Sequence, residues 1–196
     1  MKRIALIATV LAAVSCSGGT EKNWTFAEKA LISGPDPVMR VLTIENRKDS
    51  ILLRTPSAEI PAELVAGEEY KDLARKLIAT VTSPEQDGVG IAGPQVGLLR
   101  RVVAVQRFDK EGEPFEVYPN IRVIKTRGEM APGGEGCLSV PGRRGKVLRY
   151  QDIDISYTSP HTLRDTVETV TGFTAVIFQH ETDHLDGILY IDKLAD

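Results

Sequence analysis

The chain has few cysteines, few histidines and no long hydrophobic or basic run, and each shortage limits what it can be. Among 196 residues there are two cysteines, three histidines and 6% aromatic residues. The formal charge of −3, without a basic run, gives no reason to expect nucleic-acid binding. With 42% hydrophobic and 26% charged residues, the composition is that of a globular protein. The length suits one domain of ordinary size with its own core.

The first apolar run, residues 4–14, is too short to cross a bilayer as a helix. Lys2 and Arg3 precede it, and small residues lead from it to Cys16, which a polar Ser-Gly-Gly-Thr segment follows. This pattern resembles a bacterial lipoprotein signal. We therefore expect residues 1–15 to be a signal peptide.

On this interpretation Cys16 carries lipid, residues 16–37 form a flexible tether with one short helix, and the protein is anchored in the cell envelope, facing the periplasm or the surface. Two alternatives stay open: an ordinary signal peptide, and a cytoplasmic protein whose true start lies downstream. If Cys16 is acylated, Cys137 is a lone thiol in an oxidising compartment. Metal ligation would protect it.

The strongest chemical signal is the segment His180-Glu181-Thr182-Asp183-His184. Two histidines four residues apart on a helix lie one turn apart on nearly the same face, so both imidazoles can reach one metal ion. Glu181 between them is placed to take a proton from a water at such a site. Upstream, Phe173, Val176 and Ile177 continue the same helical stripe, so we expect the histidines on the inward, apolar face.

A third ligand must come from upstream of the helix. Metzincin proteases supply a third histidine where this chain has Tyr190, and no glutamate follows His184 as thermolysin-like enzymes require. The best candidate is Cys137, because a thiolate with two imidazoles binds zinc or ferrous iron and leaves a fourth position for water. The alternatives are Cys137 as a small buried apolar residue and Glu135 as the ligand instead.

Three separated segments together resemble the motifs of peptide deformylases. They are Gly88-Val89-Gly90-Ile91-Ala92-Gly93-Pro94-Gln95, then Glu135-Gly136-Cys137-Leu138-Ser139, then Gln179-His180-Glu181-Thr182-Asp183-His184. The resemblance covers roughly residues 38–194 and implies a single metallo-hydrolase domain over residues 38–196. One departure is Gly93, where the family usually has alanine; it adds backbone freedom beside Gln95.

The resemblance implies an enzyme that removes the N-formyl group from N-formylmethionyl peptides and releases formate. It further implies that Cys137, His180 and His184 hold one divalent ion, with Glu181 as general base. The ion is ferrous iron by family resemblance, with zinc, nickel or cobalt able to substitute. Because export would expose ferrous iron to oxidation, we expect zinc here.

The Gln95 amide and the Leu138 backbone N–H would donate to the oxyanion that develops during the reaction. By resemblance, Gly90 and Ile91 pair edge to edge with the substrate backbone, and Arg144 lies near the peptide. A solvated loop cation is the alternative for Arg144. Candidates for a methionine pocket are Ile91, Phe173 and Ile177. The expected partner is a formylated peptide, with no nucleic acid, and with a membrane only through the lipid anchor.

The pattern of the rest of the chain predicts an α+β fold, with antiparallel strands around a central metal-binding helix. A helix is predicted over residues 66–82, from an apolar stripe of Tyr70, Leu73, Leu77, Ile78 and Val81. Strands are predicted at residues 102–105 and 117–124 with a hairpin turn between them, a glycine-rich loop at residues 128–136, and further strands at residues 147–150, 153–157 and 167–170. His161 is predicted to be a surface residue in a turn.

Two other functions remain open at this stage. One is an exported metallo-amidase or peptidase that uses the same Cys-His-His site on another substrate. The other is a non-catalytic lipoprotein that keeps the fold as a metal- or peptide-binding module.

Overall fold

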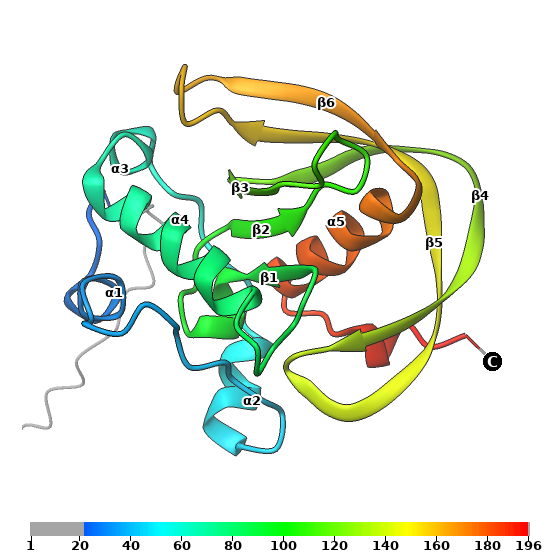
Figure 1. Ribbon diagram of the computed structural model, residues 1–196, viewed down its shortest axis with the longest axis horizontal. Helices are drawn as coiled ribbons and strands as arrows, with labels where there is room; N and C mark the ends of the chain where they lie inside the picture. The colour runs from blue at the N-terminus through cyan, green and yellow to red at the C-terminus, as the bar shows by residue number, and fades with distance from the viewer. Residues whose placement is uncertain (1–21, 196) are drawn as a thin grey trace, which may run out of the picture.

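The computed structural model describes residues 22–195, so the predicted signal peptide and Cys16 lie outside the described part. Two antiparallel sheets pack around one central helix, α5 (Gly172–Leu185), which Figure 1 shows between β1 and β2 on one side and the long β4–β5 hairpin on the other. The predicted α+β class with strands around the metal-binding helix is confirmed. No helix among the described residues is both long and apolar enough to span a bilayer.

The first sheet has the order β1-β2-β3, with antiparallel strands throughout. Its strands are β1 (Gly90–Ala92), β2 (Val102–Gln106) and β3 (Phe115–Pro119). Residues 102–105 are all fully buried, which explains why this β-branched run shows no alternation in sequence. The predicted hairpin turn between β2 and β3 is confirmed, because Val103 pairs with Tyr118 across it.

The second sheet is built on one long hairpin, with β6 at its outer edge. Its strands are β4 (Arg122–Cys137), β5 (Val140–Thr158) and β6 (Asp165–Thr171). Figure 1 shows β4 and β5 as a long curved hairpin that runs from beside β6, past α5, toward the C-terminal end of the chain. This curvature brings the end of β4, with Cys137, next to the metal-binding helix.

The predicted glycine-rich loop at residues 128–136 is wrong, because this segment is the second half of β4. The backbone of Gly133 and Gly134 pairs with Val147 and Lys146 of β5. Gly128 has a φ of +71° and lies at a shift in the β4–β5 register, where the strand changes direction. Glycine here allows the strand to bend, and the partner strand supplies the pairing that local composition does not reveal.

The predicted strand at residues 117–124 is divided in two by Asn120, which has a φ of +58°. The Asn120 side chain accepts from the Ile60 N–H at 2.7 Å and donates to the Ile60 carbonyl at 2.8 Å. It also donates to the Thr158 hydroxyl at 3.0 Å. These bonds to distant segments hold the left-handed conformation that ends β3.

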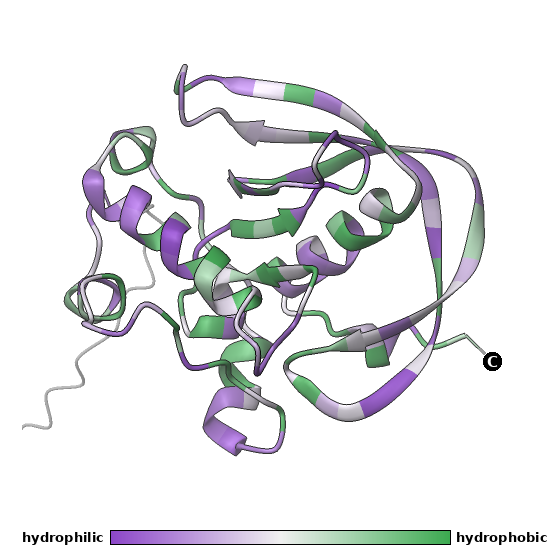
Figure 2. Cartoon of the chain, viewed as in Figure 1, coloured by the Kyte–Doolittle hydropathy of each residue, from purple (hydrophilic) through white to green (hydrophobic). Residues whose placement is uncertain are grey.

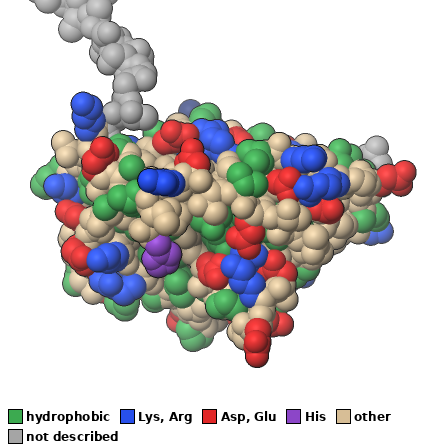
Figure 3. Space-filling model, turned by 90° about the horizontal axis from the view of Figure 1, so that it is seen from above, with side chains coloured by type: hydrophobic (Ala, Val, Ile, Leu, Met, Phe, Trp, Pro, Cys, Tyr) green, Lys and Arg blue, Asp and Glu red, His purple; other side chains and the backbone are tan. Residues whose placement is uncertain are grey.

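The predicted first long helix is confirmed as α4 (Glu68–Val81), and the predicted stripe faces the core. Two short helices, α2 (Arg47–Leu53) and α3 (Ala62–Val65), were missed because they are too short to show periodicity. Figure 2 shows hydrophobic residues along β1 and β2, and hydrophobic and hydrophilic residues together on α5 and on the long β4–β5 hairpin. The face seen in Figure 3 interleaves acidic and basic side chains, in keeping with the small net charge.

The predicted tether is shorter than expected. Helix α1 (Phe26–Ile32) begins at the N-cap Thr25, which forms a capping box with Glu28. Trp24 and Ile32 are 4% and 1% exposed and belong to the core cluster with α4. Residues 24–32 therefore belong to the packed domain, because this segment buries large apolar side chains that a flexible tether would leave in water.

Candidate metal centre

Helix α5 carries both predicted histidine ligands, His180 and His184, on adjacent turns. Gly187 ends the helix with a φ of +74°, and a side chain there would meet the Arg54 carbonyl oxygen at 2.6 Å. His180 and His184 lie one turn apart, with ring centroids at 5.0 Å and planes at 74°. The sequence spacing therefore gave the correct geometry for a shared ligand site.

Cys137 reaches the same place from the end of β4. Its Sγ lies 3.2 Å from Nε2 of His184, and the candidate ligand atoms of Cys137, His180 and His184 all lie within 4.8 Å of one another. The three predicted metal ligands are thus brought together from segments 43 residues or more apart. Apolar residues pack around Cys137, among them Val140, Val147, Leu189 and Tyr190.

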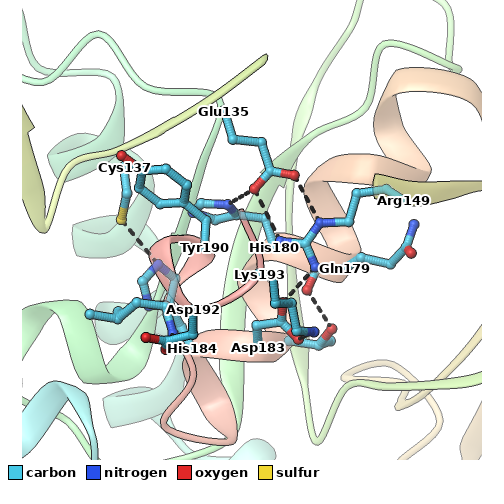
Figure 4. Close-up of polar contacts among 12 residues, drawn as sticks. Glu135, Cys137, Arg149, Gln179, His180, Asp183, His184, Tyr190, Asp192 and Lys193 are labelled. Atoms are coloured by element: carbon cyan, nitrogen blue, oxygen red, sulfur yellow. Dashed lines mark hydrogen bonds and ion pairs between the residues drawn. The ribbon is translucent and has the colours of Figure 1, made fainter. Parts of the chain in front are cut away.

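A charged network holds the ring of His180 in place (Figure 4). The Nδ1 of His180 donates to Glu135 at 2.8 Å, and Arg149 donates to both oxygens of Glu135 at 2.8 and 3.0 Å. Arg149 also forms an ion pair with Asp183, and Asp183 accepts a hydrogen bond from Lys193 Nζ at 2.6 Å. With Nδ1 engaged by a carboxylate, His180 keeps Nε2 as the atom free for a metal, an arrangement common around metal-ligating histidines.

Sequence reasoning gave Glu135 only as a substitute ligand and missed its partner Arg149. Burial raises the pKa of Glu135, but the His180 and Arg149 contacts outweigh burial and lower the pKa to about 2. Glu135, bonded to both His180 Nδ1 and Arg149, is placed to orient the His180 ring. Glu135 and Cys137 are two residues apart on β4 and so share a face, but the sequence predicted a loop here and did not reveal this relation.

Glu181 is a buried carboxylate without a complete set of partners. Burial raises the pKa of Glu181 to about 7, and its Oε2 has no hydrogen-bond partner among the described residues. Gly90 faces it closely, since a Cβ there would lie 2.5 Å from Glu181 Oε1. Glycine at position 90 therefore makes room for this carboxylate.

Gln95 is held rigidly with its amide nitrogen toward the metal centre. It lies in the short 3₁₀ helix η1 (Gly93–Val96) and is 1% exposed. Its Oε1 accepts from the Ala92 N–H at 2.8 Å, which leaves Nε2 at 3.6 Å from Cys137 Sγ and 3.2 Å from Ser139 Oγ. Fixing the oxygen in this way directs the N–H donors at the cluster.

Gly93, the departure from the family motif, lies in a tight site. A Cβ there would approach the carbonyl oxygens of Arg100 and Leu98 to 2.7 and 2.8 Å. This chain therefore has no room for alanine at position 93 without a backbone shift. The backbone around Gly93 is closely packed, which limits the freedom that a glycine would otherwise add beside Gln95.

A cavity of about 580 Å³ opens beside the cluster. Of the residues predicted to act on substrate, it is lined by Gly90, Gln95, Leu138, Arg144, Phe173, Ile177 and Glu181. Phe173 is 55% exposed and lines the cavity. The N-terminal end of the apolar stripe on α5 therefore faces the cavity and not the core. Leu138 lies in the turn between β4 and β5.

Ile91 is not a pocket residue, and this prediction is wrong. Its side chain is fully buried in the core cluster beside Leu73 and Leu77 of α4. Successive residues of a strand point to opposite faces, so Gly90 faces the cavity and Ile91 faces the core. His161 lies exposed in the turn before β6, as predicted.

The residues present suit a metal ion. One thiolate and two imidazoles are a donor set for zinc or ferrous iron. The Oε2 of Glu181 is a buried polar atom without a partner among the described residues, so a carboxylate beside the three ligands is left unsatisfied by the side chains around it. The α+β fold and this Cys-His-His centre beside a carboxylate define a metallo-hydrolase class of protein.

Comparison with known proteins gives the family. The family model described as polypeptide deformylase matches residues 38–196. A peptide deformylase of Leptospira biflexa is 33% identical over 165 residues, covering 80% of this chain and 88% of the relative. Peptide deformylase 2 of Nostoc sp. is 42% identical over 130 residues, covering 63% of this chain and 71% of the relative. The chain belongs to the polypeptide deformylase family.

Solved structures agree with this assignment. A class I type b peptide deformylase from Acinetobacter baumannii, bound to Met-Ala-Ser, has a TM-score of 0.70 at 32% identity, over 80% of this chain and 98% of the other. Peptide deformylase from Thermotoga maritima has a TM-score of 0.70 at 27% identity, over 81% and 99%. The chain is therefore an enzyme, and the expectation of a non-catalytic binding module is set aside.

Proposed function

We propose that this metallo-hydrolase cleaves the N-formyl amide of N-formylmethionyl peptides, giving formate and a peptide with a free amino group. The observation that supports this most is the convergence of Cys137, His180 and His184 within 4.8 Å, beside a cavity that Glu181 lines. The Acinetobacter relative bound to Met-Ala-Ser supports a methionyl peptide as the ligand of this cavity.

Cys137, His180 and His184 would hold one divalent ion, and Glu135 would keep His180 in the orientation for it. When bound, the ion would polarise the formyl carbonyl and make a water more acidic. Iron(II) follows from family resemblance, zinc from the expected export, and nickel or cobalt suit the same donors. Metal analysis of the purified protein tests this, and finding iron in protein taken from the envelope would contradict zinc.

Glu181 supplies the proton transfers. Its carboxylate takes a proton from the attacking water as the water oxygen bonds to the formyl carbon. The same group then gives that proton to the amine nitrogen as the carbon–nitrogen bond breaks. A pKa raised to about 7 by burial suits both steps, since a group near the working pH can accept and return a proton.

Gln95 and Leu138 would stabilise the negative charge that develops on the formyl oxygen. The Gln95 Nε2 is fixed toward the cluster by the bond from the Ala92 N–H to Oε1. The Leu138 backbone N–H belongs to the turn that lines the same cavity. Losing one such donor typically costs about 2.7–4 kcal/mol of transition-state stabilisation.

The substrate backbone would add to the sheet at β1. In the described chain, β1 is an edge strand paired only with β2, so its other edge can accept an extended peptide. The Gly90–Ile91 backbone would form these bonds, Phe173 and Ile177 would contact the methionine side chain, and Arg144 at the cavity rim would face the peptide beyond it.

The test compares formyl-Met-Ala-Ser with free Met-Ala-Ser. Release of formate from the first, with no cleavage of the second, is the expected outcome. Cleavage of the Met–Ala bond in the free peptide would instead assign a peptidase or another amidase activity to the site.

We also propose, from the sequence, that the mature protein begins at a lipid-modified Cys16 and is anchored in the cell envelope. The support is the apolar segment and the small residues before Cys16. Mass spectrometry of the mature N-terminus tests it. An acylated Cys16 is expected, and a chain that still begins at Met1 would place the protein in the cytoplasm.

A further inference from the structure

A short segment near the start of β5, beside the cavity, is not paired with β4. Cys137 pairs with Val140, but the preceding residue Gly136 pairs with Arg144, so residues 141–143 have no partner on β4. Gly142 has a φ of +69°, which makes the tight turn possible. We call residues 141–144 (Pro141-Gly142-Arg143-Arg144) the arginine bulge; its first three residues are unpaired, and Arg144 rejoins the ladder opposite Gly136.

The arginine bulge forms one rim of the substrate cavity. Gly142, Arg143 and Arg144 all line it, and all three are exposed. The stem of Arg144 passes over Gly136, where a Cβ would lie 3.5 Å from Arg144 Cγ. Exposed residues looped out of a strand are free to move unless something beneath holds them.

Tyr190 supplies such a support from below. It lies in the 3₁₀ helix η2 (Tyr190–Asp192), is 1% exposed, and donates its hydroxyl to the Arg143 carbonyl at 2.9 Å. Its ring stacks on His180 with centroids 6.0 Å apart and planes at 24° (Figure 4). One side chain thus touches both a metal-ligating histidine and the backbone of the rim.

The chain after Tyr190 holds the far end of the bulge. The Ala195 N–H donates to the Lys146 carbonyl at 2.8 Å, and Leu194 forms a bridge with Val147. The Leu194 side chain lies over Gly145, and a Cβ at position 145 would require that side chain to move. Residues 190–195 therefore fix the rim on both sides of Arg144.

We propose that Tyr190 is a positioning residue for substrate: its hydroxyl holds the arginine bulge so that Arg144 meets the peptide chain beyond the formyl-methionine. This rests on the proposed function, since it concerns the same cavity. The role belongs to the hydroxyl, because a phenylalanine ring keeps the stacking on His180 and loses only the bond to Arg143.

The experiment measures Tyr190→Phe in the metal-loaded enzyme with a long and a short substrate, formyl-Met-Ala-Ser and formyl-Met amide. We expect KM for the long substrate to rise about 3- to 10-fold, the range for one lost hydrogen bond, with kcat unchanged. KM for the short substrate, which ends before the rim, stays as in the wild type. Tyr70→Phe is the matched control, because the Tyr70 hydroxyl is buried without a partner among the described residues.

A double-mutant cycle decides whether Tyr190 acts through Arg144. If it does, Tyr190→Phe adds nothing further to KM once Arg144→Ala is present. Independent effects that multiply in the double variant would overturn the proposal. A fall in kcat with both substrates, or a loss of bound metal, would also overturn it. Either result would mean that the Tyr190 hydroxyl supports the metal ligands on α5 and not the arginine bulge.

Direct binding separates this inference from the proposed function. Calorimetry with the peptide Met-Ala-Ser needs no turnover, and we expect the same 3- to 10-fold weakening in Tyr190→Phe. Absence of formate release by the wild type would defeat the proposed function while this binding difference stood. Equal affinity of wild type and variant for Met-Ala-Ser would defeat the positioning role alone.

Discussion

Two buried charged clusters pack against helix α5, and they differ in how fully their polar atoms are paired. Arg107, only 1% exposed, lies over the Tyr118 and Phe178 rings. It donates to Asp109 at 2.7 and 2.8 Å and to Glu168 at 2.6 Å, and also contacts Glu116 and Tyr118. We call this group the Arg107 cluster.

The metal centre on the same helix is built differently. Glu135 is fully paired, but Glu181 Oε2 has no partner among the described residues. Both clusters take charge out of water, yet one satisfies it internally and the other leaves it for a ligand. The Arg107 cluster thus has the complete pairing of a structural element, whereas the metal centre keeps an unpaired carboxylate oxygen beside a cavity.

The largest effect that would test this contrast is on activity. Glu181→Gln should lower kcat about 10²- to 10⁴-fold, the usual contribution of a general acid–base group. The free energy of unfolding should stay equal or rise, because an incompletely paired buried carboxylate is costly. Steady-state assays with metal content measured in parallel check it. Near wild-type turnover with metal bound would remove Glu181 from the mechanism.

The Arg107 cluster should respond in the opposite way. Arg107→Leu leaves Asp109 without its cation, and leaves Glu116 and Glu168 with Lys110 alone. We therefore expect a loss of about 3 kcal/mol in the free energy of unfolding. The kcat of the folded enzyme should not change. Urea unfolding measures the loss, with Arg122→Leu as control, because its pair with Glu59 is half exposed and worth at most about 1 kcal/mol. Equal losses in the two variants would contradict the structural role.

Removing the metal should affect stability as well as activity. A chelator should abolish turnover and lower the free energy of unfolding by about 2.7 kcal/mol relative to protein with the ion at one hundred times its Kd. Thermal unfolding with and without added ion measures this. In Cys137→Ser the dependence on the ion should weaken, because a hydroxyl is a poorer ligand than a thiolate. Full metal affinity in Cys137→Ser would show that Cys137 is not the third ligand.

The smallest expected effect is a pH dependence confined to the Arg107 cluster. The hydrogen bond from Arg107 holds the pKa of Asp109 below its ordinary value of 3.8. A carboxyl with a depressed folded-state pKa stabilises the fold above its unfolded pKa, and this contribution is lost as pH falls through the folded pKa. The stability gap between wild type and Arg107→Leu should therefore narrow below about pH 4. A constant gap from pH 7 to pH 3 would contradict the assignment.

Local patterns predicted a large part of the site. The spacing of His180 and His184 predicts that they share one face of α5. The apolar stripe of α4 predicts which side of α4 is buried. Such features depend on neighbours within one or two helical turns, and sequence reports these directly.

The errors occurred where partners far apart in sequence decide the outcome. The glycine-rich segment before Cys137 is a strand because β5 pairs with it, and Ile91 is core because α4 covers that face of β1. Arg149 joins Glu135 and Asp183 only after the long hairpin curves past α5.

By itself the sequence determined the helix that carries two imidazoles and a carboxylate, and the family to which the three motifs belong. The sequence also named Cys137 as the third ligand, and the tertiary structure brought its sulfur to the two imidazoles. Only the tertiary structure revealed the Glu135–Arg149 support and the Tyr190 hydrogen bond to the rim. The physical reason is that helical spacing is a local property of the backbone. The meeting of residues 137, 149, 180 and 190 depends instead on strand register and packing, which no single stretch of the chain encodes.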